Sequence, residues 1–331
     1  GGGLYITTGT LAGTGSITAY GGEGRDFILK GAGGGGGRIA LYYTLDSSSF
    51  STVSARGGVG KGNSDDGAAG TVYKKPSSGN GYLIIDNETN ADTDDDRTRV
   101  TSDIDLVSLL VQNYGRIEVS ASNVTAPTVT VDSASELIVS GGLSTTDLTV
   151  KNSSDLVVES GSTVTYNTLD WSTSGILTDN GGTMAILSGG GDLLVPTTST
   201  LNANTLRTYN SLDLDGTISH SQNSTAQTYE IDLTITNDAD ISGEINVNGD
   251  GLAGGYGSGT GVACGQLSGC GGAGYGGAGG DGEDTAGGGI YGSATFPVDV
   301  GSGGSSTYGG GHGGGYIRFD VGGTLTVGGS I

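Results

Sequence analysis

The sequence predicts an all-β protein, a parallel β-helix or solenoid combined with a glycine-rich bundle of polyglycine-II-type helices. Between residues 76 and 250, short runs of alternating apolar residues recur about every ten residues, as in regularly turned β-structure. The best helical candidate, residues 104–112, is short, contains valine and lacks a cap. Glycine makes up 69 of the 331 residues and is concentrated at both ends of the chain, whereas only 4 prolines occur, which excludes collagen.

The net charge of −22, from 35 acidic and 13 basic residues, limits the classes of partner. Such a surface repels nucleic acid and anionic lipid, so we expect neither as a partner. No run of about 18 apolar residues exists, so no membrane span is expected. The scarcity of lysine and the abundance of Thr, Ser, Asn and Asp are typical of secreted, extended β proteins. We therefore expect an extracellular protein at the cell surface. The lack of an initiating Met and of a signal peptide suggests a processed product or a piece of a longer chain.

The first predicted region, residues 1–75, repeats one unit. Each unit is a glycine run, an alternating strand, a turn, a second short strand and further glycine, and the strand Arg38–Tyr43 has the period of two expected of β-structure. The copies occupy residues 1–22, 34–58 and, in shortened form, 67–73. The last residues, 313–331, follow the same pattern, and the stretch 323–331 matches 9–17 and then stops within the unit.

The second predicted region, residues 76–250, is a succession of strands separated by Asn, Asp, Ser and Gly. A β-sandwich and a parallel β-helix both fit this pattern, and the monotony of the runs favours the solenoid. Its core would be a narrow stack of Leu, Val and Ile, with Trp171 in the core or over one end. The predicted strands are 83–85, 116–119, 128–131, 137–139, 148–150, 156–158, 193–195, 212–214, 233–235 and 245–247.

The third predicted region, residues 251–331, is rich in glycine and is expected to pack with 1–75 of the same or a neighbouring copy. Within 271–282, glycine recurs every third residue in two columns, one beginning at Gly271 and the other at Gly276. A period of three fits a polyproline-II-type helix, which has no internal hydrogen bonds and must bond to neighbouring segments. The alternative is a flexible linker.

The repeated unit carries a resemblance to known proteins, through residues 36–43, 54–58 and 67–73. It resembles the glycine-rich repeats of very large bacterial and archaeal surface proteins and the glycine-rich extracellular domain of the anaplastic lymphoma kinase family. The middle region resembles the right-handed β-helices of filamentous-haemagglutinin-like adhesins. These resemblances imply a structural or adhesive role at the cell surface, with no catalytic residues to transfer.

Few residues suggest specific chemistry. The cluster Asp92, Asp94 and Asp96 could hold calcium, the one cofactor that we consider, although it lacks the glutamate and glycine of an EF-hand loop and a solvated acidic turn is the alternative. Cys264 and Cys270 are expected to pair, with two free thiols as the alternative. Candidate sites for N-glycosylation, which chance also produces in such a sequence, are Asn87, Asn123, Asn152 and Asn223. His220 and His312 lack partners at zinc-ligand spacing.

The sequence therefore predicts a non-enzymatic structural protein without catalytic or cofactor-binding residues, a subunit or repeat of a surface filament or fibrous adhesin. Other copies, joined head to tail, are the expected partners, and surface glycans are a further candidate. The expected assembly ends are Gly1, Gly2, Gly3 and Leu4 at one end and Gly329, Ser330 and Ile331 at the other. The alternative is a carbohydrate-processing or glycan-binding β-helix of the tailspike or lyase type, which would need paired carboxylates on one sheet face. A passive glycan- or ice-binding solenoid would need a flat threonine ladder, at which Thr128, Thr130, Thr149 and Thr165 hint.

Overall fold

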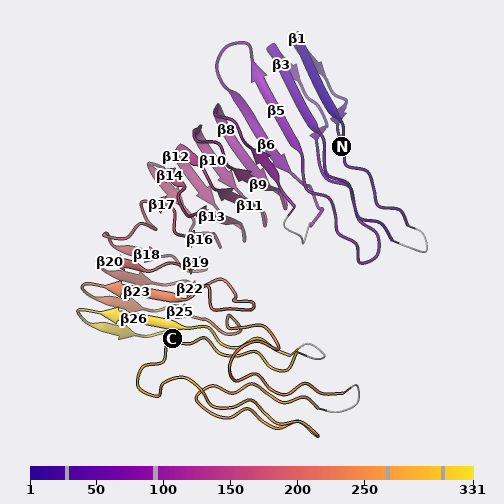
Figure 1. Cartoon of the computed structure of the whole chain (residues 1–331). Coiled ribbons are helices and arrows are strands. Elements are labelled where there is room, and N and C mark those ends of the chain that lie inside the picture. The colour runs from indigo at the N-terminus through magenta and orange to yellow at the C-terminus, as the bar shows by residue number, and fades with distance from the viewer. Residues whose placement is uncertain (27–29, 92–95, 266–268, 307–309) are drawn as a thin grey trace. The chain divides into compact units, whose positions relative to one another are not determined.

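The computed structural model describes residues 1–26, 30–91, 96–265, 269–306 and 310–331. Within them the chain is all-β, without a helix, and its strands form several mostly parallel sheets (Figure 1). This arrangement is consistent with a β-solenoid. The chain divides into two compact units, Gly1–Ala185 and Ile186–Ile331, so the boundary falls inside the predicted strand region rather than at a change of composition.

The N-terminal unit contains one long sheet, a second sheet and a short pair of strands. The long sheet follows the order β1 (Gly3–Gly13), β3 (Arg38–Ser48), β5 (Thr71–Pro76), β6 (Gly81–Asp86), β8 (Ile104–Gln112), β10 (Val124–Val131), β12 (Gly142–Val150), β14 (Thr163–Thr165) and β17 (Thr183–Met184), with β15 (Thr168–Asp170) also paired to β12. The second follows β7 (Thr98–Val100), β9 (Arg116–Val119), β11 (Glu136–Val139), β13 (Asp155–Glu159) and β16 (Ile176–Asn180), and the pair is β2 (Ser16–Thr18) with β4 (Thr52–Ser54). Only the β5–β6 ladder among these is antiparallel.

The strands of the C-terminal unit also form rows of parallel strands, three in number among the described residues. Its strands are β19 (Thr200–Ala203), β22 (Thr217–Ser219) and β25 (Glu244–Ile245); β18 (Leu193–Val195), β21 (Leu212–Leu214), β24 (Ala239–Ile241) and β27 (Leu325–Val327); and β20 (Arg207–Tyr209), β23 (Ile231–Ile235) and β26 (Ile317–Val321).

The core consists of columns in which equivalent apolar residues lie directly above one another. Because the strands pair in register, alternation places every second side chain inward at the same level of each coil. One such column joins Leu109, Val129 and Leu148 of β8, β10 and β12, all almost fully buried; another joins Ile117, Leu137, Leu156 and Leu177. The predicted stack of Leu, Val and Ile is present, and Trp171 is buried.

The glycine-rich stretches of the N-terminal unit are extended segments outside the strands, and their backbone bonds repeat every third residue. Segment 31–37 donates from one set of residues to segment 19–25 and from another to segment 64–70. The first set is Gly31 to Arg25, Gly34 to Gly22 and Gly37 to Ala19; the second is Gly33 to Asp65 and Gly36 to Ala68. One segment thus bonds to two neighbours on different sides, which a flat β-strand cannot do at this period.

In the C-terminal unit, a glycine-rich segment likewise forms backbone hydrogen bonds to several neighbouring segments. Segment 271–274 donates to the carbonyls of Gly259 and Gly280 and accepts from the N–H of Gly288, so it contacts three other segments. A bend at 275–277 separates it from segment 278–282. The stretch 271–282 is therefore two short segments side by side, joined by this bend.

Candidate functional site

The outermost strand of the N-terminal unit, β1, contains the first group of predicted assembly residues. The register pairs Leu4 with Ile39 and Ile6 with Leu41. Ile39 and Leu41 are buried, whereas Leu4 and Ile6 are only partly buried, because within the described residues β1 has a strand on one side alone. The amino group of Gly1 donates to the carbonyl of Gly35 at 2.6 Å, and Gly2 and Gly3 continue the chain into β1.

The outermost strands of the C-terminal unit, β26 and β27, have the same property. Leu325 and Val327 of β27 pair with Ala239 and Ile241 of β24. Those partners are buried, but Leu325 and Val327 are 43% and 47% exposed. The second group of predicted assembly residues closes this coil, since the N–H of Gly329 donates to the Ile241 carbonyl at 2.8 Å, Ser330 bridges to Glu244, and Ile331 is 56% exposed. Within the described residues, the apolar columns are therefore open on one side at β1 in one unit and at β27 in the other.

The glycine columns of 271–282 are only partly used for close packing. A Cβ at Gly274 would lie 2.5 Å from the Gly289 oxygen and 2.6 Å from the Gly288 oxygen, which no side chain can occupy. A Cβ at Gly277 would meet no atom within 4 Å. The period of three therefore does not by itself predict which glycines pack closely, because Gly277 lies in the bend at 275–277 and faces open space. Tight contacts recur in Gly271, Gly274, Gly279 and Gly282.

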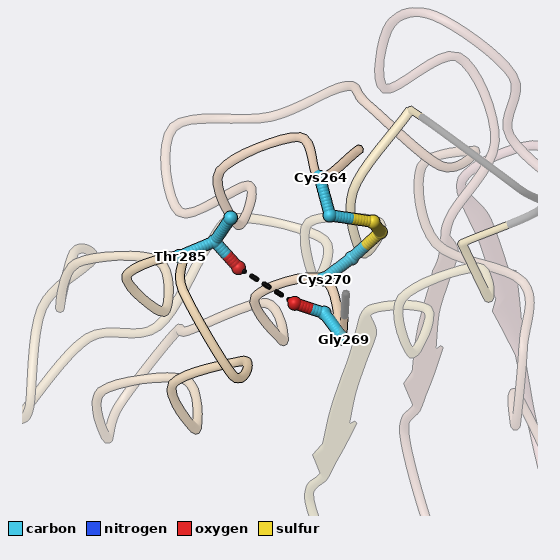
Figure 2. Close-up of a disulfide and its surroundings, with 4 residues drawn as sticks. All are labelled: Cys264, Gly269, Cys270 and Thr285. Carbon is cyan, nitrogen blue, oxygen red and sulfur yellow. Dashed lines mark hydrogen bonds between the residues drawn. A yellow bond between two sulfur atoms is a disulfide. The ribbon is translucent and has the colours of Figure 1, made fainter. Parts of the chain in front are cut away.

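Cys264 and Cys270 form a disulfide (Figure 2), with their Cα atoms 4.7 Å apart. Beside it, the Thr285 hydroxyl donates to the Gly269 carbonyl at 3.0 Å. The bond therefore closes one loop of the glycine-rich segments, and the neighbouring hydrogen bond ties that loop to the segment carrying Thr285.

The proposed calcium ligands lie largely outside the described residues. Asp92 and Asp94 fall there, and Asp96 is exposed. In the part of the chain that the structure describes, no group of three or more His, Cys, Asp or Glu residues is arranged to hold a metal ion.

The four sequons differ in accessibility. Asn87 and Asn223 are buried and their side-chain amides are hydrogen-bonded, so neither is open to a glycan in the folded chain. Asn123 and Asn152 are exposed, although each amide donates to an aspartate, Asp103 and Asp132 respectively.

Asn87 and its neighbour Asn90 instead hold the glycine segments of the N-terminal unit, a role that the sequence did not reveal. The Asn87 side-chain oxygen accepts from the Gly57 N–H at 2.8 Å, and its amide donates to the Gly67 carbonyl at 3.2 Å. The Asn90 amide donates to the Gly57 carbonyl at 2.7 Å. Both side chains are buried, so they satisfy backbone groups that water cannot reach.

His220 has a comparable structural role in the C-terminal unit. It is buried, and its Nε2 accepts from the Tyr316 N–H at 3.3 Å. Its Nδ1 lies 2.8 Å from the Ser221 carbonyl, which can only accept, so Nδ1 is the donor in this contact. The ring therefore links the end of β22 to the glycine run before β26.

A carboxyl pair, which the sequence also failed to indicate, arises from the register of β11 and β13. Glu136 lies opposite Asp155, and Arg116 lies on the other side of Glu136, with its Nε 3.8 Å from a Glu136 oxygen. Burial raises the pKa of Asp155 to about 7; the Thr178 hydroxyl, 3.0 Å away, lowers it, and the Glu136 charge raises it further.

The threonines at which an ice- or glycan-binding ladder was suggested do not form one flat row. Thr130 lies opposite Thr149, but Thr128 lies opposite Asp147 and Thr165 opposite Ser144. The outer face of β10 and β12 is therefore a mixed surface of hydroxyls and carboxylates.

Comparison with known proteins found no matching family model, no similar curated protein and no similar solved structure. Among the described residues, no helix has the length and apolar character needed to cross a membrane.

Proposed function

We propose that this chain is a non-enzymatic extracellular structural protein, a subunit or repeat of a surface filament or fibrous adhesin. One observation carries the proposal: in the part of the chain that the structure describes, no strand covers the apolar columns at β1 in one unit and at β27 in the other. Apolar side chains in such columns are stabilised when a further coil removes them from water. An open parallel strand edge also offers unpaired backbone groups to another strand.

The two open edges suit one another in sequence. Leu4 and Ile6 on β1 and Ile317 and Phe319 on β26 occupy the inward positions after a glycine run. A coil like that of β26 and β27 would therefore stack on β1 with apolar residues facing apolar residues. Because the two edges are different surfaces, the contact is heterologous and does not close, and its product is a filament.

We also propose that the glycine-rich segments of both units are polyglycine-II-type helices packed as bundles. Two observations support this proposal. The backbone hydrogen bonds of these segments repeat every third residue, and so do glycines at which an added Cβ would clash with a neighbouring backbone. Such a bundle is rigid without side chains, which suits a structural element that continues from coil to coil.

Sedimentation and negative-stain electron microscopy of the full chain test the proposed assembly. We expect concentration-dependent end-to-end oligomers, which Leu325→Lys should abolish by placing a charge in the open column. Leu194→Lys is the matched control, since Leu194 is also exposed but faces outward between the buried Leu193 and Val195. A monomer at every concentration, or equal loss of assembly in both variants, would contradict the proposal.

The rival, a carbohydrate-processing β-helix, has one observation in its favour, the carboxyl pair Glu136–Asp155. Asp155 is, however, partly buried and hydrogen-bonded to Thr178, and Glu136 lies beside Arg116. These contacts suit a structural pair better than groups that must reach a substrate, so we favour the structural role.

A further inference from the structure

The long sheet of the N-terminal unit is interrupted at one level in four successive coils. In the pairing of β10 with β12, Pro127 and Thr146 are left unpaired between two paired stretches. In the pairing of β8 with β10, the two residues before Thr128 are left unpaired. One coil further, β14 ends at Thr165 and β15 begins at Thr168, both against β12. Proline has no N–H for the ladder, and the Thr145 hydroxyl donates to the Pro127 carbonyl at 3.2 Å. In β10 the interruption is therefore built into the sequence, through Pro127.

A shallow groove lies over this part of the sheet and crosses its strands. It consists of two adjoining hollows of about 320 and 360 Å³ that share Thr125 and Ser144. The side chains around this groove that can hydrogen-bond are Asn80, Ser122, Asn123, Thr125, Ser144, Thr145, Thr146, Thr163, Thr165 and Asn167. None of the lining residues is charged, although the protein carries a net charge of −22.

The groove also has apolar surface and carboxylates at its border. Pro127 lines the groove and is exposed. At the border of the groove, Tyr82 of β6, which is 39% exposed, pairs with Ser108, and Ser108 pairs with Thr128, so the three residues form a row across the strands. In the same row Asp147 accepts from the Thr168 hydroxyl at 2.7 Å, and at the other border Asp105 accepts from the Thr125 hydroxyl. The second of these bonds holds the hydroxyl of Thr125, which lines the groove, in a fixed position.

We propose that this groove binds a linear, neutral glycan. Hydroxyl and amide groups on successive strands can exchange hydrogen bonds with the hydroxyls of successive sugar units, and Pro127 and Tyr82 offer apolar surface to the C–H faces of the rings. The uncharged lining and the acidic protein disfavour acidic polysaccharides, whose carboxylates would find no cation in the groove. The groove is formed by strands and turns of the N-terminal unit other than β1, so this inference does not depend on end-to-end assembly.

Isothermal titration of the full chain with cellohexaose, xylohexaose and mannohexaose tests the inference, with trigalacturonate as the anionic probe. We expect at least one neutral hexasaccharide to bind with a millimolar or lower dissociation constant, and trigalacturonate not to bind. Ser144→Lys, at the junction of the two hollows, should weaken binding at least tenfold. Ser140→Lys is the matched control, since Ser140 is exposed but does not line the groove, and it should bind as the unaltered chain does.

Three results would overturn the inference: no binding of any neutral hexasaccharide, binding of trigalacturonate alone, or equal affinity of the unaltered chain and Ser144→Lys. Circular dichroism of both variants verifies that they are folded. The assembly variant Leu325→Lys should retain glycan binding, so failure of the filament proposal and failure of this one are distinguishable.

Discussion

Gly274 and Gly277 are three residues apart, yet their surroundings differ completely. For Gly274→Val we expect a loss of about 3 kcal/mol or more in the free energy of unfolding, because the new side chain meets the carbonyl oxygens of Gly288 and Gly289. Gly277→Val, which enters open space, is the matched control and should change that free energy by less than about 1 kcal/mol. Urea unfolding of both variants measures the difference. Equal destabilisation would contradict the packing described for segment 271–274.

Asp155 should make the N-terminal unit more stable in mild acid than at neutral pH. Its pKa is raised from 3.8 to about 7 on folding, so below 3.8 the carboxyl is protonated in both states and carries no penalty. As the pH rises from 3.8 to 7, the unfolded chain ionises first and stability is lost, and the loss is complete above 7.

Asp155→Asn should remove this dependence, raising the free energy of unfolding at pH 8 by on the order of 4 kcal/mol relative to its effect at pH 4. Urea unfolding of both proteins at the two pH values measures this difference. An identical pH dependence of the two proteins would show that the pair with Glu136 and Thr178 does not control the titration.

At the scale of the element, each glycine segment depends on side chains that reach it from elsewhere in the chain. Asn87→Ala leaves the Gly57 N–H and the Gly67 carbonyl without a partner. We expect a loss of about 3 kcal/mol, since each buried unpaired group costs about 1–3 kcal/mol. Asn123→Ala, at an exposed asparagine, should cost about 0.5 kcal/mol or less. Thermal unfolding of the two variants measures the contrast, and similar melting temperatures would contradict the role of Asn87.

The disulfide belongs to the same scale. The loop between Cys264 and Cys270 is short, so closing it restricts the unfolded chain by only about 2 kcal/mol in the loop-entropy model. We expect the Cys264→Ser, Cys270→Ser double variant to remain folded, with faster proteolysis confined to the neighbouring glycine segments. Global unfolding of that variant would mean that the bond stabilises much more than its own loop.

The strands could be predicted from sequence because alternation reports directly which side chains face inward. The predicted runs 116–119 and 193–195 coincide with β9 and β18. The partners of each residue could not be predicted, because they depend on the number of residues in each coil, which turns and bulges vary. Glu136 and Asp155 become neighbours only through the register, and Asn87 looks in sequence like any turn asparagine. Period-three glycine indicated close packing, but not the bend at 275–277.

At the scale of the whole molecule, apolar attraction between the open edges competes with electrostatic repulsion. Each copy carries a net charge of −22, so approach of two copies is unfavourable at low ionic strength. Salt screens this repulsion, since the Debye length falls from about 30 Å at 0.01 M to about 8 Å at 0.15 M. Apolar burial at β1 and β27 is not weakened by the same salt.

We therefore expect the association constant of the proposed end-to-end contact to rise about tenfold or more as sodium chloride rises from 10 to 150 mM. The oligomers should become longer over the same range. Sedimentation velocity at fixed protein concentration measures the change. Leu325→Lys provides the control, because it should remain monomeric at both salt concentrations if the open column of β27 is the contact. Dissociation of oligomers by added salt would instead indicate a contact held by ion pairs, and would move the interface away from the apolar edges.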